Sequence, residues 1–149
     1  MHVDAPAEAA WDLVADVTRM GEWSPETTGA RWLGGASGAV VGARFLGRNA
    51  QGRMRWVTLS VVEEAVRGRR FTFATYLRRG GKRYTRWRFV FEPTADGGCD
   101  VTESWELVNR FPLFTRFVLT PEREALMHEG MQQTLARVAA AAVRQSSTQ

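Results

Sequence analysis

RYTRWRFVFEPTADGGCDVTESWELV, residues 83–108, consists of two alternating polar and apolar segments on either side of a glycine pair. Successive side chains of a strand point to opposite sides of a sheet, so each segment has two faces. The turn Asp96-Gly97-Gly98 predicts that the two strands form an antiparallel hairpin. One face of this hairpin is aromatic and mostly apolar, and it holds Thr85, Trp87, Phe89, Phe91, Val101, Glu103, Trp105 and Leu107.

The same period of two extends toward the N-terminus, to about residue 30. Consecutive strands with short glycine turns between them predict an antiparallel meander. In the strand before the hairpin, Phe71, Phe73, Thr75 and Leu77 share one face. The predicted strands cover 30–33, 42–49, 53–64, 69–78, 83–92 and 100–108.

Helical spacing precedes the strands. Residues 5–17 predict a helix with Pro6 at its first position, where proline is well tolerated. A short second helix is predicted over 17–23, and it ends before Ser24 because the residue that precedes a proline is disfavoured in the helical conformation.

A long C-terminal helix is predicted over 120–144, with Thr120 as its cap and Pro121 in its first turn. It is the only predicted helix long enough to cover the aromatic face of the sheet. Methionine adapts to irregular space, so either the sheet aromatics fill the gap as an ordinary core, or a cavity remains. The inner face of this helix carries Met127, Met131, Thr134, Leu135 and Val138.

The composition indicates one globular domain, 1–149, with 44% hydrophobic residues and a net charge of +4. No apolar run is long enough to span a bilayer, and no signal peptide is visible, so we expect a cytoplasmic protein. A single cysteine, Cys99, excludes an internal disulfide. With only two histidines besides, the chain lacks an ordinary histidine and cysteine metal site. We expect no metal and no cofactor.

Several segments resemble the START-like helix-grip superfamily, and more closely its polyketide cyclase/dehydrase and lipid-transport branch, often called SRPBCC. The opening of the chain is similar in Trp11-Asp-Leu-Val-Ala-Asp16 and in Trp23-Ser-Pro25. Trp87-Arg-Phe-Val-Phe-Glu-Pro93 matches a strand of the family, and Gly130-Met-Gln-Gln-Thr-Leu135 is the most specific stretch. These segments cover almost the whole chain in the family's order.

The resemblance implies an α+β helix-grip fold. In this fold a curved antiparallel sheet wraps around a long C-terminal helix, two short N-terminal helices close one end, and a cavity for an apolar ligand lies between sheet and helix. Only Met1–Asp4 precedes the first helix here, whereas the family begins with a full strand. Either this strand is very short or the native chain begins upstream.

Glu103 is the candidate catalytic residue. By alternation it lies on the aromatic face, where a carboxylate would have a raised pKa and could act as a general acid or base. The alternatives are a bulge that turns Glu103 into solvent, or an ion pair with an arginine. The predicted ligand-binding residues, chosen for stacking or hydroxyl contacts, are Trp23, Trp56, Phe71, Phe73, Thr85, Trp87, Phe89, Trp105, Met127, Met131 and Thr134.

Residues 78–88 contain six basic side chains and form the predicted tip of a hairpin with an outward basic face that includes Tyr84. The main interpretation is a solvated edge that discourages strand association. Contact with an anionic membrane surface is an alternative that would suit a lipid carrier. Binding to nucleic acid is not expected. His128 lies at the flank of the C-terminal helix and is expected to be solvated.

The predicted function is binding of a hydrophobic small molecule, such as a lipid, a polyketide or an aromatic metabolite, in the internal cavity. The first alternative is a cyclase or dehydratase that uses polar groups of the cavity. The second alternative is a protein-interaction or co-chaperone module that uses the outside of the sheet. We expect either a monomer or a homodimer.

Overall fold

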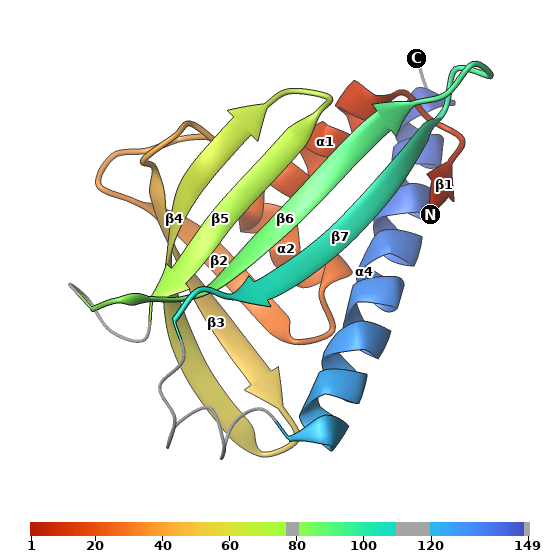
Figure 1. Ribbon diagram of the computed structural model, residues 1–149. Helices are drawn as coiled ribbons and strands as arrows, with labels where there is room; N and C mark the ends of the chain where they lie inside the picture. The colour runs from red at the N-terminus through yellow and green to blue at the C-terminus, as the bar shows by residue number, and fades with distance from the viewer. Residues whose placement is uncertain (77–80, 110–119, 148–149) are drawn as a thin grey trace.

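The computed structural model describes residues 1–76, 81–109 and 120–147. In this part of the chain, seven strands form one antiparallel sheet in the order β1-β7-β6-β5-β4-β3-β2 (Figure 1). All six strand pairs are antiparallel, as the predicted meander requires. The strands are β1 (His2–Val3), β2 (Thr27–Leu33), β3 (Arg44–Gln51), β4 (Met54–Val66), β5 (Arg70–Tyr76), β6 (Arg83–Pro93) and β7 (Cys99–Leu107).

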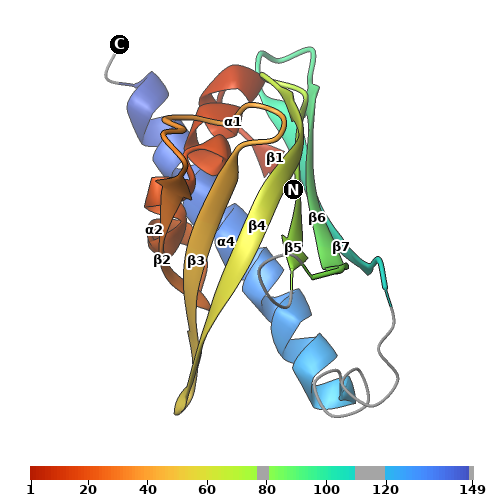
Figure 2. The same ribbon diagram turned by 90° about the vertical axis from the view of Figure 1, so that its left-hand side faces the viewer.

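The first two helices close one end of the sheet. Helix α1 spans Ala7–Ala15, and a 3₁₀ turn over Val17–Arg19 leads into α2, Met20–Trp23. Helix α2 ends before Ser24, as predicted, and Pro6 lies at the cap rather than at the first helical position. Viewed from the side, α1 and α2 lie within the curve of the sheet (Figure 2).

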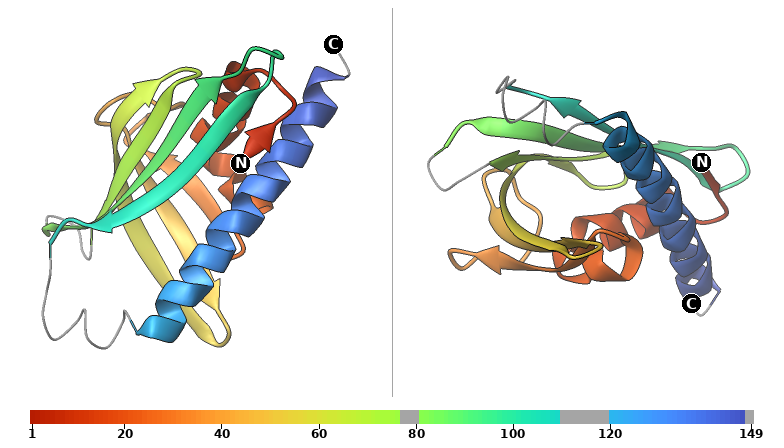
Figure 3. Two further views of the ribbon diagram at one scale, coloured as in Figure 1. Left: turned by 45° about the vertical axis from the view of Figure 1, so that its right-hand side comes forward. Right: turned by 90° about the horizontal axis from the view of Figure 1, so that it is seen from below.

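Helix α4, Pro121–Ser146, is the long C-terminal helix. The hydroxyl of Thr120 accepts a hydrogen bond from the backbone N–H of Arg123 at 3.2 Å, so the predicted cap is confirmed. The helix runs diagonally across the open side of the curved sheet (Figure 3). The helix-grip fold implied by the resemblance is therefore confirmed.

Irregularities in strand pairing accompany the curvature of the sheet. The register shifts between Thr27 and Gly29, between Val62 and Glu64, and between Thr75 and Tyr76. A bulge inserts an extra residue into one strand, which bends that strand and increases its twist. The sheet can therefore curve around α4 instead of lying flat against it.

The core lies where α1 and the C-terminal half of α4 meet the sheet. Phe71 and Phe91 are almost completely buried there. Trp11 packs edge-on against Phe71, with ring centroids 6.4 Å apart, and its indole N–H donates to the carbonyl of Arg70 at 2.9 Å. From α4, Val138 and Ala142 are fully buried in this region. The core therefore fills one end of the space under the sheet.

The predicted strands are all present, with ends that differ by at most three residues. Strand β2 begins at Thr27, three residues earlier than predicted, and β4 continues to Val66. The first strand is the two-residue β1, which pairs with β7 through His2 and Val3. Residues 77–80, which include Leu77 of the predicted strand 69–78, and residues 110–119 lie outside the described residues.

Candidate ligand-binding pocket

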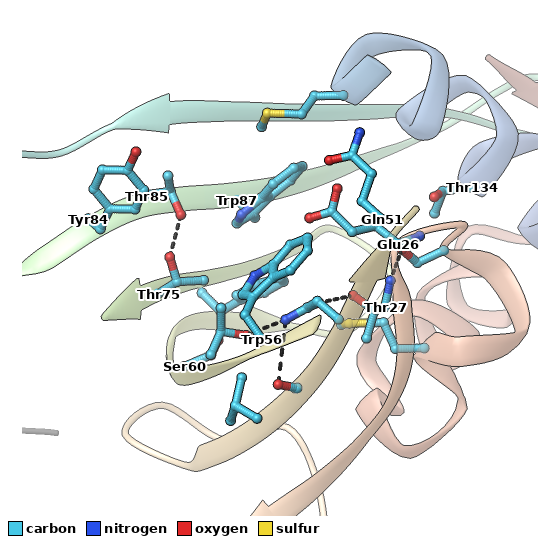
Figure 4. A pocket seen from close by; sticks show the side chains of 18 of the residues that line it. Glu26, Thr27, Gln51, Trp56, Ser60, Thr75, Tyr84, Thr85, Trp87 and Thr134 are labelled. Carbon is cyan, nitrogen blue, oxygen red and sulfur yellow. Dashed lines mark hydrogen bonds between the residues drawn. The ribbon is translucent and has the colours of Figure 1, made fainter. Parts of the chain in front are cut away.

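A pocket of about 830 Å³ lies between the concave face of the sheet and the N-terminal half of α4. Its walls come from β3 to β7, from α2 and the segment that follows it, and from the first turns of α4. Figure 4 shows side chains from part of this lining. Because the core occupies the other end of this space, the pocket and the core share the same sheet.

Strand register arranges the concave face in parallel rows. Phe73 lies opposite Trp87, which lies opposite Trp105, and this makes an aromatic row across β5, β6 and β7. Two residues along each strand, Thr75 lies opposite Thr85 in a polar row. Residues two apart on a strand are separated by roughly 7 Å. The pocket wall therefore alternates between flat apolar rings and small hydroxyl groups.

Most of the residues predicted to bind the ligand line the pocket. Trp56 of β4 and Trp87 of β6 both line the pocket (Figure 4), and Met127 and Thr134 enter from α4. Their assignment to ligand binding stays a prediction. The predicted residues found in the lining are Trp23, Trp56, Phe73, Thr85, Trp87, Phe89, Glu103, Met127 and Thr134.

Three of the predicted residues are not in the lining. Phe71 is fully buried in the core, where it packs against Trp11 and Phe73. Trp105 packs beside Trp87, with ring centroids 6.3 Å apart, and so contributes to the support of the pocket wall. Met131, one turn after Met127, is only partly buried and does not reach the pocket. Alternation and helical spacing predict which face of a strand or helix a side chain lies on. They do not predict whether that side chain lies in the packed core or in the pocket.

Several lining residues were not among the predicted ligand contacts. Phe45, Gly47 and Asn49 share the concave face of β3, and Ser60 lies opposite Phe45 on β4. Asn49 is buried, and its side chain accepts from the hydroxyl of Thr27 at 2.9 Å. The alternation of residues along β3 could have predicted that Phe45, Gly47 and Asn49 face inward.

Tyr84 corrects an expectation. The strict alternation of β6 placed it on the outward basic face, but the register shift between Thr75 and Tyr76 makes Tyr84 the extra residue of β6 between Arg83 and Thr85. Its side chain lines the pocket (Figure 4), and burial raises the pKa of its hydroxyl. A bulge turned this side chain inward, which a period of two could not predict.

The outward basic face carries ion pairs in its described part. Arg86 donates to Glu63 at 2.5 Å and to Glu106 at 2.8 Å, and these carboxylates raise the pKa of its guanidinium. Arg83 contacts the same Glu63 at 3.1 Å. Arg78 and Arg79 fall outside the described residues.

Arg123 of α4 connects the helix to the sheet at the rim of the pocket. It donates to Gln51 at 2.6 Å and to Glu26 at 2.7 Å. Its guanidinium also lies over the ring of Trp56, 5.5 Å from the centroid. One side chain therefore holds the start of α4 against the end of β3, the segment after α2, and β4.

Glu103 is the most unusual ionisable group of the pocket. It lies opposite Phe89 on the concave face, and its Oε2 atom is buried without a hydrogen-bond partner among the described residues. Burial raises the pKa of this carboxyl to about 8. No arginine of the described part of the chain forms an ion pair with it. A group of this kind is largely protonated at neutral pH and can give up a proton inside the pocket.

Other candidate groups lie away from the pocket. His128 is exposed on α4. Over residues 1–76, 81–109 and 120–147, no group of histidine, cysteine and acidic side chains has an arrangement that could hold a metal ion. No helix in the same ranges is long and apolar enough to cross a membrane.

A curved antiparallel sheet that encloses a long C-terminal helix, with a pocket between them, defines a helix-grip protein. The chain belongs to the polyketide cyclase/dehydrase and lipid transport family, whose model matches residues 1–143. No curated protein matches the sequence.

Solved structures share the fold. The Polyketide_cyc-like protein Cgl2372 from Corynebacterium glutamicum is 32% identical, with a TM-score of 0.51, over 95% of this chain and 81% of that one. TTHA0849 from Thermus thermophilus is 20% identical, with a TM-score of 0.71, over 98% and 95% of the two chains. The di-domain ARO/CYC StfQ from the steffimycin biosynthetic pathway is 18% identical, with a TM-score of 0.69. This last similarity covers 99% of the present chain and 44% of StfQ.

Proposed function

We propose that the protein binds a hydrophobic, largely aromatic small molecule in the pocket between the sheet and α4. The observation that carries this proposal is the pocket of about 830 Å³ whose lining includes the indole rings of Trp56 and Trp87. Ligand sites are typically concave and mainly apolar, with a few polar groups that orient the ligand. Membership of the polyketide cyclase/dehydrase and lipid transport family supports the same class of ligand.

Aromatic rings suit a flat ligand. Trp56 and Trp87 are only partly buried, so their faces remain accessible from the pocket. Aromatic pairs stabilise each other by about 0.5–1.5 kcal/mol beyond the area they bury. The flexible Met127 of α4 can adapt to ligands of different outline. We therefore favour a planar ring system over a saturated chain.

The test is binding of N-phenylnaphthylamine, a neutral aromatic dye that fluoresces in apolar surroundings. Met127→Trp places an indole in the pocket, and we expect it to abolish the fluorescence increase. Met131→Trp is the matched control, because Met131 lies on the same helix but outside the lining. Equal dye binding by both variants would refute the proposal. Native mass spectrometry of the purified wild type would identify a ligand that co-purifies.

Glu103 favours a second function, an enzyme of the cyclase or dehydratase type. Its carboxyl can give its proton to the hydroxyl of a β-hydroxy ketone, which leaves as water. The resulting carboxylate can then take a proton from the α-carbon, which lies between the carbonyl carbon and the carbon that carried the hydroxyl. The products are one enone and one water, and the carboxyl is restored.

The test for this second function uses the β-hydroxy ketone that forms from benzaldehyde and acetone, because its dehydration product absorbs in the near ultraviolet. We expect the wild type to accelerate dehydration and Glu103→Gln to remove the acceleration. Glu106→Gln is the control, since Glu106 lies on the same strand but faces outward and is exposed. Equal rates for wild type and Glu103→Gln would exclude this role.

A further inference from the structure

Three hydroxyl side chains form one row across the wall of the pocket. Ser60 of β4 lies opposite Thr75 of β5, and Thr75 lies opposite Thr85 of β6. Opposed residues in neighbouring antiparallel strands have Cβ atoms roughly 4.5–5.5 Å apart. All three residues line the pocket. The strand register therefore gathers three hydroxyl groups from three consecutive strands.

This hydroxyl row has protons that are not donated in a hydrogen bond between its own members. The Oγ of Ser60 is buried and has no hydrogen-bond partner among the described residues. The hydroxyls of Thr75 and Thr85 form a short hydrogen bond with each other (Figure 4). Each hydroxyl has one proton to donate, so this bond uses only one of the two threonine protons. The row keeps the Ser60 proton and one threonine proton for an acceptor.

The other small polar groups of the pocket already have partners. Asn49 bonds to Thr27 at 2.9 Å and to Thr58 at 3.2 Å. Thr134 donates its hydroxyl to the carbonyl of Gly130, one turn earlier in α4, at 2.9 Å. The hydroxyl row differs from these groups at Ser60, whose buried hydroxyl has no partner among the described residues. A buried hydroxyl without a partner costs free energy that an incoming acceptor would recover.

Aromatic side chains flank the hydroxyl row. Phe45 lies opposite Ser60, while Phe73 and Trp87 form the adjacent row on β5 and β6. An acceptor that reaches the hydroxyls is therefore attached to a body that contacts aromatic rings. A carbonyl oxygen fits this position, since it accepts two hydrogen bonds and needs to donate none.

We propose that Ser60, Thr75 and Thr85 form a subsite that binds the carbonyl oxygen of a planar aromatic ketone and so determines how the ligand is oriented. This inference rests on the proposed function, because it concerns a ligand in the same pocket. The subsite discriminates between ring systems of equal shape. A ligand without the oxygen leaves the hydroxyls unpaired and binds more weakly.

The test compares fluorenone with fluorene by isothermal titration calorimetry. The two molecules have nearly the same planar outline, and only fluorenone has a carbonyl group. Thr85→Val keeps the shape of the side chain and removes its hydroxyl. Thr102→Val is the matched control, because Thr102 of β7 is exposed and does not line the pocket. Thermal melts by circular dichroism check that each variant folds.

We expect the ratio of the two affinities, fluorenone over fluorene, to fall about tenfold in Thr85→Val relative to the wild type, which is the usual worth of one hydrogen bond. The use of a ratio cancels the different water solubilities of the two compounds. Ser60→Ala should lower the ratio in the same direction, and Thr102→Val should leave it unchanged.

The outcomes separate the two proposals. If both compounds bind and the ratio is the same in the wild type, Ser60→Ala and Thr85→Val, the subsite is refuted and the apolar pocket remains. If neither compound binds to the wild type, the proposed function itself is overturned, and the subsite with it. If Thr85→Val does not fold, Ser60→Ala decides the same question.

Discussion

Arg123 and Glu26 form the ion pair that joins the first turn of α4 to the segment before β2. Two of their atom pairs lie at 2.7 Å, which is the geometry of a bidentate contact. The side chain of Arg123 is 16% exposed and that of Glu26 is 32% exposed, so solvent screens the pair only in part. The same guanidinium contacts Gln51 and Trp56. This ion pair therefore fixes the distance between helix and sheet at the rim of the pocket.

Replacement of Glu26 by glutamine should loosen this rim. We expect a loss of about 1 kcal/mol in the free energy of unfolding, because the pair is partly buried and Arg123 keeps its contact with Gln51. Dissociation of N-phenylnaphthylamine should become faster. Urea denaturation and stopped-flow fluorescence measure the two effects. Glu22→Gln, which removes the exposed ion pair with Arg19, is the control and should leave dye dissociation unchanged.

The raised pKa of Glu103 makes stability depend on pH. In the folded protein the carboxyl titrates at about 8, whereas the ordinary value is 4.5. Between these values the folded state holds a proton that the unfolded state has lost, so stability falls as the pH rises through this window. The contribution of the raised Glu103 pKa to the free energy of unfolding is complete below about pH 4.5 and is lost above about pH 8.

Glu103→Gln should remove this dependence, since the amide is neutral at every pH. We expect the free energy of unfolding of the variant, relative to that of the wild type, to rise by roughly 2–4 kcal/mol between about pH 5 and about pH 9. Urea denaturation at the two pH values gives the comparison. Parallel pH profiles for the two proteins would show that Glu103 is ionised in the folded state at neutral pH.

Substitutions of Phe71 and Trp87 should have different effects, because Phe71 belongs to the core and Trp87 lines the pocket. Phe71 is fully buried against Trp11, so Phe71→Ala should cost about 3–5 kcal/mol of unfolding free energy through the cavity that it leaves. Trp87 is partly buried and lines the pocket, so Trp87→Ala should cost less stability and weaken dye binding more. Chemical denaturation and dye titration of both variants test the contrast. A larger loss of stability in Trp87→Ala would contradict it.

Gly21 allows α2 to approach β2. A Cβ atom at this position would lie 2.8 Å from the backbone carbonyl oxygen of Thr28, so the helix would have to move. We expect Gly21→Ala to destabilise the fold by roughly 1–3 kcal/mol, as overpacking commonly does. Trp23, which α2 contributes to the pocket, should shift with it. Gly38→Ala meets no atom within 4 Å and is the control. Thermal denaturation should separate the two variants.

Local patterns in the sequence predicted the antiparallel meander, the helices and part of the candidate site, whereas the helix-grip arrangement was implied by the family resemblance. The period of two in β6 and β7 placed Trp87, Phe89 and Glu103 on one face, and the structure has them on the concave face. The cap at Thr120 predicted the start of α4. These features depend on neighbours within a few residues, whose geometry the chain itself imposes.

The tertiary structure determined which residues lie opposite one another. The hydroxyl row of Ser60, Thr75 and Thr85 comes from strand register, and the inward position of Tyr84 comes from a bulge. The burial of Phe71 in the core follows from packing against α1. These relationships result from hydrogen bonding and close packing between different helices and strands. A local period defines the face of a side chain, whereas the depth of the pocket depends on how far α4 stands from the sheet.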